Sequence, residues 1–182
     1  MRILLTLIQC ILVPILLCGQ GEDQIRYSYV FTEKLKAVSL DFMEPVEGFY
    51  KVKKLTHDDF LHYDLVLHSI EKNFEMRFII KKDTAGLLPH IECFNMSNTV
   101  AINDDHFDLR MQFFGSDQLE ETFHADWGAY VDFIPKRTVT DKHFGRLLTL
   151  YAEHKGIIHA IFFFNHHDRE KDIRMLSFSF LE

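Results

Sequence analysis

The apolar residues divide the chain into a short N-terminal segment and a longer region of mixed pattern. Residues 3–17 are almost continuously apolar, Arg2 precedes them, and small and polar residues follow. A positive start, an apolar stretch of this length and a small-residue end are typical of a secretory signal peptide, and the stretch is short for a transmembrane helix. The sequence therefore predicts a signal peptide at residues 1–20 and a single domain at residues 21–182.

Alternation of polar and apolar residues indicates several strands in this domain. Residues 63–68 and 75–81 alternate in this way and, with a short polar segment between them, predict an antiparallel hairpin. Residues 107–114 and 176–180 have the same character. Residues 157–164 are nearly all apolar, which is typical of a central strand covered on both faces.

Other segments favour helices. Residues 141–154 carry an apolar stripe with the spacing i, i+3, i+4 and i+7 of a helix, formed by Phe144, Leu147, Leu148 and Tyr151. Thr140 is a suitable N-cap, and Gly156 a suitable stop. Another helix is expected to open after Pro89 and to run through residues 90–103.

Three shorter segments complete the pattern. Residues 25–31 alternate like a strand, whereas residues 33–36 are equally compatible with a helix. Residues 115–117 indicate a turn, and residues 168–175 are compatible with a short helix. Helices interspersed with antiparallel strands predict an α+β fold, a mainly antiparallel sheet flanked by helices.

The single tryptophan lies in a stretch with the period of a strand. One parity holds the apolar residues Trp127, Ala129, Val131 and Phe133. The other parity holds polar residues and a glycine, namely His124, Asp126, Gly128, Tyr130 and Asp132. A core face opposite a polar face is therefore expected.

The polar parity is the candidate ligand-binding site, formed by His124, Asp126, Tyr130 and Asp132. Carboxylates, an imidazole and a phenol could bind a cation or a polar ligand. Alternate side chains on a strand lie about 6.5–7 Å apart, so another strand or loop would have to complete such a site. The alternative is an ordinary solvated strand face.

Composition and charge restrict the class of partner. The chain is 47% hydrophobic and 14% aromatic, which is enough for a packed core. Its formal net charge of -7, without a basic patch, counts against nucleic acid and against anionic membranes. Contact with a membrane is expected only through the signal peptide or through lipidation.

Cysteine usage fits a secreted domain without a disulfide. Cys10 and Cys18 lie in the signal segment, so the mature chain keeps Cys93 alone, which we interpret as a buried, inert thiol. The segment ending at Cys18 also resembles a bacterial lipoprotein signal, although Leu17 stands where a small residue is expected. Secreted or periplasmic localisation is expected in either case.

No established catalytic or cofactor motif is present, so no catalytic residue and no cofactor are assigned. The weak candidates for metal ligands are the adjacent His166, His167 and Asp168, but no paired-histidine motif with the spacing of a zinc site accompanies them.

Several features together resemble a known group of small domains. The sequence Phe-x-x-Pro-x-x-Gly-Phe occupies residues 42–49, a late apolar strand follows Gly156, and Ser177 and Phe178 lie near the end. This order is similar to that of the PsbP/Mog1/DcrB group. Asp-Trp-Gly at residues 126–128 and the terminal pattern also resemble uncharacterised secreted proteins of the Bacteroidota type.

The resemblance implies an antiparallel sheet sandwiched by helices, in a group whose members are mostly accessory or partner-binding proteins. The functional expectation is a secreted or periplasmic binding or accessory protein, whose partner is another protein or a small polar ligand. The alternative is a metal-dependent hydrolase that uses some of the histidines and aspartates.

Overall fold

The computed structural model describes residues 28–43, 50–52, 61–69, 73–84, 86–102, 109–166 and 177–181. The expected signal peptide, all but the first two residues of the sequence motif at residues 42–49, and the expected helix at residues 168–175 lie outside these ranges. Within them, no helix is both long and apolar enough to cross a membrane.

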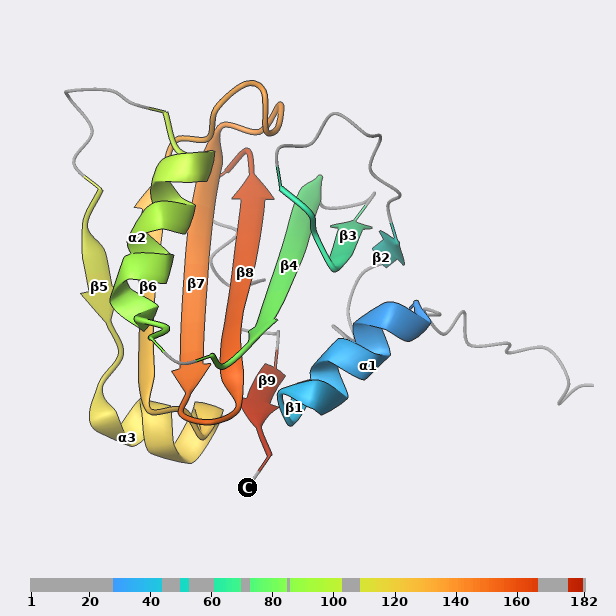
Figure 1. Cartoon of the computed structure of the whole chain (residues 1–182). Helices are drawn as coiled ribbons and strands as arrows, with labels where there is room; N and C mark the ends of the chain where they lie inside the picture. The colour runs from blue at the N-terminus through green and yellow to red at the C-terminus, as the bar shows by residue number, and fades with distance from the viewer. Residues whose placement is uncertain are drawn as a thin grey trace, which may run out of the picture.

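A seven-stranded sheet forms the centre of the fold (Figure 1). In order across the sheet its strands are β2 (Tyr50–Val52), β3 (Leu65–Ser69), β4 (Phe74–Lys82), β8 (Gly156–Phe164), β7 (Phe144–Ala152), β6 (Trp127–Phe133) and β5 (Met111–Phe113). Every neighbouring pair is antiparallel. The fold is therefore α+β with a mainly antiparallel sheet and flanking helices, as the sequence predicts.

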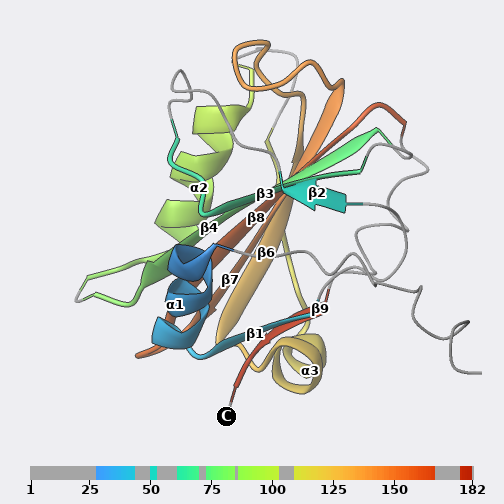
Figure 2. The same ribbon diagram turned by 90° about the vertical axis from the view of Figure 1, so that its right-hand side faces the viewer.

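Different elements cover the two faces of the sheet, and Figure 2 shows α2 and the β1–β9 ribbon on opposite sides. The helix α2 (Pro89–Val100) packs on one face. The other face carries α1 (Tyr29–Ala37), a two-stranded ribbon of β1 (Leu40–Met43) with β9 (Ser177–Phe180), and α3 (Ser116–Gln118), which continues as a π-helix (Leu119–Phe123).

Each face has its own hydrophobic core. On the α2 side, Cys93 and Met96 belong to one cluster with Phe133 and Phe163 of the sheet. On the other side, Phe31 of α1 belongs to a larger cluster that includes side chains from most of the strands. The strand β8 is buried along its whole length, which confirms the expectation of a central strand covered on both faces.

The expected helix at residues 141–154 is wrong, because the chain forms β7 between β6 and β8. Leu147 belongs to the core on the α2 side, whereas Leu148 and Leu150 belong to the core on the other side. A strand buried on both faces has a nearly continuous apolar sequence, and such a sequence also satisfies the spacing of a helix. Hydrogen bonding to two neighbouring strands decides the outcome.

Gly156 does not stop a helix but opens β8. A Cβ atom there would collide with the main-chain carbonyl of Lys81 on β4. The turn between β7 and β8 instead uses His154, which has a left-handed backbone with φ of 64°. The glycine is therefore required by close approach of two strands.

Other expectations have mixed outcomes. The hairpin is confirmed as β3 and β4, α2 begins at Pro89 as expected, and residues 177–180 form β9. Residues 29–31, which were compatible with a strand, are helical in α1, whose N-cap Ser28 accepts a 3.2 Å hydrogen bond from the main chain of Phe31. The chain passes residues 116–123 in a helical segment, not in a simple turn.

Candidate functional site

The polar residues around Trp127 do not share one face. The strand β6 begins at Trp127, so His124 and Asp126 precede it, and His124 ends the π-helix with a left-handed φ of 48°. Tyr130 and Asp132 do lie on the same strand face, opposite the core face that holds Val131 and Phe133. Gly128 on that polar parity is buried, because side chains of the π-helix and of the chain before it cover it.

Tyr130 and Asp132 are held by neighbouring side chains. Arg146 on β7 forms a bidentate ion pair with Asp132, with N–O distances of 2.6 and 2.8 Å. Its guanidinium carbon lies 4.8 Å from the centre of the Tyr130 ring, and the Tyr130 hydroxyl donates to Gln112 at 2.7 Å. Contacts with Arg146 and Gln112 therefore hold the side chains of Tyr130 and Asp132 in place.

Asp126 has a different role, at the turn between β7 and β8. Its carboxylate accepts a 2.7 Å hydrogen bond from the main-chain N–H of Glu153. Asp83 acts in the same way on the N–H of His154, at 2.9 Å, and accepts from the hydroxyl of Tyr151 at 3.3 Å. Desolvation and then the charge of Asp83 raise the pKa of Tyr151. Both carboxylates therefore stabilise a turn.

The part of the chain that the structure describes contains no assembled metal site. No group of three or more His, Cys, Asp or Glu residues there could hold a metal ion. Of the weak metal candidates, His166 is exposed, while His167 and Asp168 lie outside the described residues.

The buried histidine of β8 is part of a polar chain beneath α2. The Nδ1 atom of His159 lies 2.9 Å from the Thr149 hydroxyl, which also hydrogen-bonds the Cys93 thiol. Burial, and then the charge of Lys81, lowers the pKa of His159 to about 3. Burial raises the pKa of the Cys93 thiol, which is 0% exposed and so cannot meet a substrate.

A hollow lies elsewhere among the described residues, where α2, the segment before β3 and the β6–β7 connection meet. Its volume is about 670 Å³, in the range of small-molecule sites. Its lining residues are Leu61, Tyr63, Asn95, Asn98, Thr99, Lys136, Thr138 and Val139. We call it the α2 cavity.

The wall that α2 provides is fixed by Lys136. Its ammonium donates to the carbonyls of Asn98 and Thr99, at 2.8 and 2.9 Å, and its main-chain N–H donates to Val100. A cation at the carbonyl end of a helix compensates both the unpaired carbonyls and the helix dipole. This contact joins the end of α2 to the β6–β7 connection.

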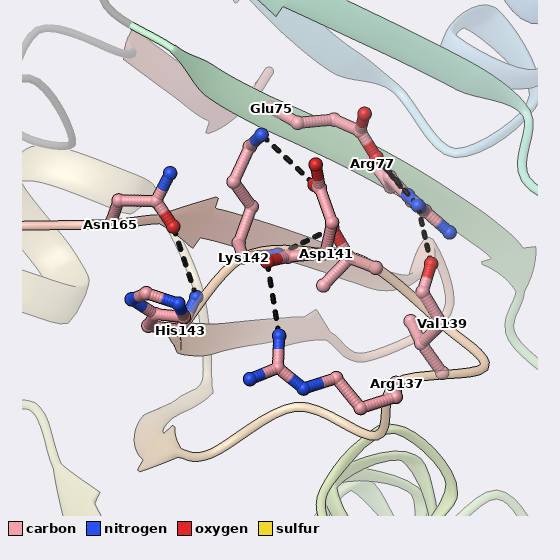
Figure 3. Close-up of polar contacts among 9 residues, drawn as sticks. Glu75, Arg77, Arg137, Val139, Asp141, Lys142, His143 and Asn165 are labelled. Atoms are coloured by element: carbon pink, nitrogen blue, oxygen red, sulfur yellow. Dashed lines mark hydrogen bonds and ion pairs between the residues drawn. The ribbon is translucent and has the colours of Figure 1, made fainter.

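The opposite wall rests on a buried ion pair. Arg77 on β4 contacts the Glu75 carboxylate at 2.6 Å and donates to the Val139 carbonyl at 2.8 Å, as Figure 3 shows. Its guanidinium also lies over the Tyr63 ring at 4.8 Å. Burial works to lower the pKa of Arg77, but Glu75 and then Tyr63 outweigh it, so the pKa is raised and the charge is retained. Tyr63 and Val139 are thereby held in place.

No pattern in the sequence predicts the α2 cavity. Asn95 and Asn98 are ordinary polar positions on a helix whose buried face is apolar, and Tyr63 and Val139 belong to connections around it. These groups meet only because the β6–β7 connection folds over the end of α2, which is a tertiary contact without local periodicity.

Comparisons of the chain with protein-family models, with curated proteins and with solved structures found no match. The resemblance to the PsbP/Mog1/DcrB group stays a prediction. We therefore argue function from the cavity and its chemistry.

Proposed function

We propose that the chain is an exported binding protein and that its ligand is a small, uncharged, polar molecule held in the α2 cavity. The observation that carries the proposal is the cavity itself, which has a volume of about 670 Å³. Contacts of Lys136 and Arg77 hold its walls in place. Export follows from the expected signal peptide at residues 1–20.

The lining supports a neutral ligand. No carboxylate is among its described residues, so a cationic ligand lacks a partner, and the one ammonium, on Lys136, already contacts two carbonyls. Asn95 and Asn98 each present a carboxamide, which both donates and accepts, and neither carboxamide is engaged within the described chain. Ligand hydroxyls or amides match these groups.

The walls support binding without large rearrangement. Lys136 holds the end of α2, and Arg77 holds Tyr63 and Val139, so both sides of the cavity are fixed before a ligand arrives. Groups that are already ordered lose little conformational entropy when they bind. Leu61 and Val139 add apolar surface for the body of the ligand.

A ligand-detected NMR screen tests the proposal on the full mature chain. The probes are uncharged monosaccharides, N-acetyl sugars and cyclic dipeptides. The variant Asn95→Trp fills the cavity from the exposed side of α2, and His90→Trp is the matched control, because His90 is exposed on the same helix but does not line the cavity.

At least one probe should bind the unmodified chain and the control, and fail to bind Asn95→Trp. Absence of binding by every probe would overturn the proposal. Equal binding to Asn95→Trp would place the ligand elsewhere and would also overturn it.

A further inference from the structure

A second hollow lies beside the same β6–β7 connection and has different chemistry. Its volume is about 470 Å³. Part of its lining is apolar and comes from Ile102, Ile134, Pro135 and Phe144; the remainder is basic and comes from Arg137, Lys142 and His143. We call it the basic hollow.

The basic hollow concentrates positive charge in an acidic protein. The whole chain has a formal net charge of -7, yet no carboxylate lines this hollow among the described residues. Arg137 is exposed, and its guanidinium donates a 3.3 Å hydrogen bond to the main-chain carbonyl of Asp141 (Figure 3). A carbonyl oxygen orients the guanidinium without neutralising it, and most of its five N–H groups stay available.

Lys142 adds a charge that water screens poorly. Its side chain is 7% exposed, and its ammonium contacts the Asp141 carboxylate at 3.0 Å (Figure 3). That carboxylate belongs to a side chain that is 86% exposed, so solvent weakens its compensation of the ammonium. Among the described residues, the side chains that line the hollow therefore carry a net positive charge.

We propose that the basic hollow binds an organic anion with an apolar body. Arg137 takes the anionic group, because its planar guanidinium can hold a carboxylate by two parallel hydrogen bonds. Lys142 strengthens the attraction through its charge, and Ile102, Ile134 and Phe144 receive the apolar body. This site goes beyond the proposed function, since both its location and its ligand differ from those of the α2 cavity.

Titration calorimetry with octanoate tests the proposal on the full mature chain. Octanol has the same chain length without the charge, and acetate has the charge without the apolar body. Octanoate should bind at least about tenfold more tightly than either, because a charge-assisted pair and apolar burial each contribute. Raising the salt concentration should weaken the binding of octanoate and leave the binding of octanol unchanged.

Variants locate the site. Arg137→Gln should lower the affinity for octanoate by about tenfold or more, and Arg137→Lys should lower it less, since lysine keeps the charge. The control is Lys82→Gln. Lys82 is an exposed cation beside the start of β8 at Gly156, whereas Phe144 of the basic hollow pairs with the other end of β8, at Phe164. Octanoate that fails to bind, or that binds Arg137→Gln as well as it binds the unmodified chain, would overturn the proposal. Asn95→Trp should leave octanoate binding intact.

Discussion

Arg77 and Glu75 form an ion pair inside the protein, with both side chains 3% exposed. The same guanidinium reaches the carbonyl of Val139, 62 residues further along the chain. The pair therefore does more than balance two charges: it attaches the β6–β7 connection to β4 and supports a wall of the α2 cavity. Because the pair is buried, removal of either partner would leave the charge of the other uncompensated in an apolar environment.

Removal of one partner should be costly. Arg77→Met would leave the Glu75 carboxylate buried without its cation, and we expect a loss of about 3–5 kcal/mol in the free energy of unfolding. Denaturant melts measure it. The double variant Glu75→Leu/Arg77→Met should recover most of the loss, because no buried charge is left over. If the double variant is as unstable as the single one, packing and the Val139 contact dominate over charge.

Gly128 should be needed for close packing. A Cβ at this position would meet the side chains of Leu150, Leu119 and Phe114 at 2.7–2.9 Å. Gly128→Ala should therefore cost about 1–3 kcal/mol, the usual range for overpacking a core. Gly115→Ala is the control, since nothing lies within 4 Å of its added Cβ. Equal melting behaviour of the two variants would show that the π-helix moves aside freely.

The sequence predicts much of this fold because most strands carry local signals. The hairpin of β3 and β4 alternates, and β8 is an apolar run bounded by Gly156. The sequence does not predict β7, because Phe144, Leu147, Leu148 and Tyr151 have helical spacing and a strand buried on both faces shows no alternation; only pairing with β6 and β8 selects the strand.

The candidate site was less predictable. The sequence predicts that Tyr130 and Asp132 share a strand face, but their partner Arg146 comes from the neighbouring strand, and the register between β6 and β7 is not visible in the sequence. The α2 cavity depends on the Lys136 contact with the end of α2, which no local pattern encodes. Local patterns thus identify strands more readily than the places where connections meet.

His159 should make the protein sensitive to acid. Its pKa is about 3 in the folded protein and about 6.5 when unfolded, so the unfolded state binds more protons between these values. The stability that the neutral imidazole permits is fully present above about pH 6.5 and is lost as the pH falls towards 3. The slope from this one group approaches about 1.4 kcal/mol per pH unit in that window.

Unfolding free energies of the unmodified chain and of His159→Leu, measured from pH 7 to pH 4, check this contribution. The variant should show a shallower decline, whatever its absolute stability, while carboxylates contribute equally to both curves. His154→Gln is the control, because His154 is exposed. Parallel curves for His159→Leu and the unmodified chain would contradict a neutral, buried His159.

Export should leave a shortened chain. The apolar run ends at Leu17 and acidic residues begin at Glu22, so we predict a mature N-terminus between Gly19 and Glu22. Intact-mass analysis of the exported protein measures it, and a lipidated Cys18 would show a larger mass than a simple cleavage. Retention of residues 1–17 would contradict the prediction.

The pair of Asp132 and Arg146 decides whether the polar face of β6 is structural or ligand-binding. Both N–O contacts are short, but Asp132 is 43% exposed and Arg146 17% exposed, so solvent reduces the strength of the pair. A double-mutant cycle with Asp132→Ala and Arg146→Ala should give a coupling of about 0.5–1 kcal/mol, towards the upper end for exposed pairs because the geometry is bidentate. Tyr130→Phe keeps the ring under the guanidinium and should leave the coupling unchanged. A coupling near zero, together with a rise in melting temperature when calcium or magnesium chloride is added, would mean that Asp132 serves a cation instead of Arg146.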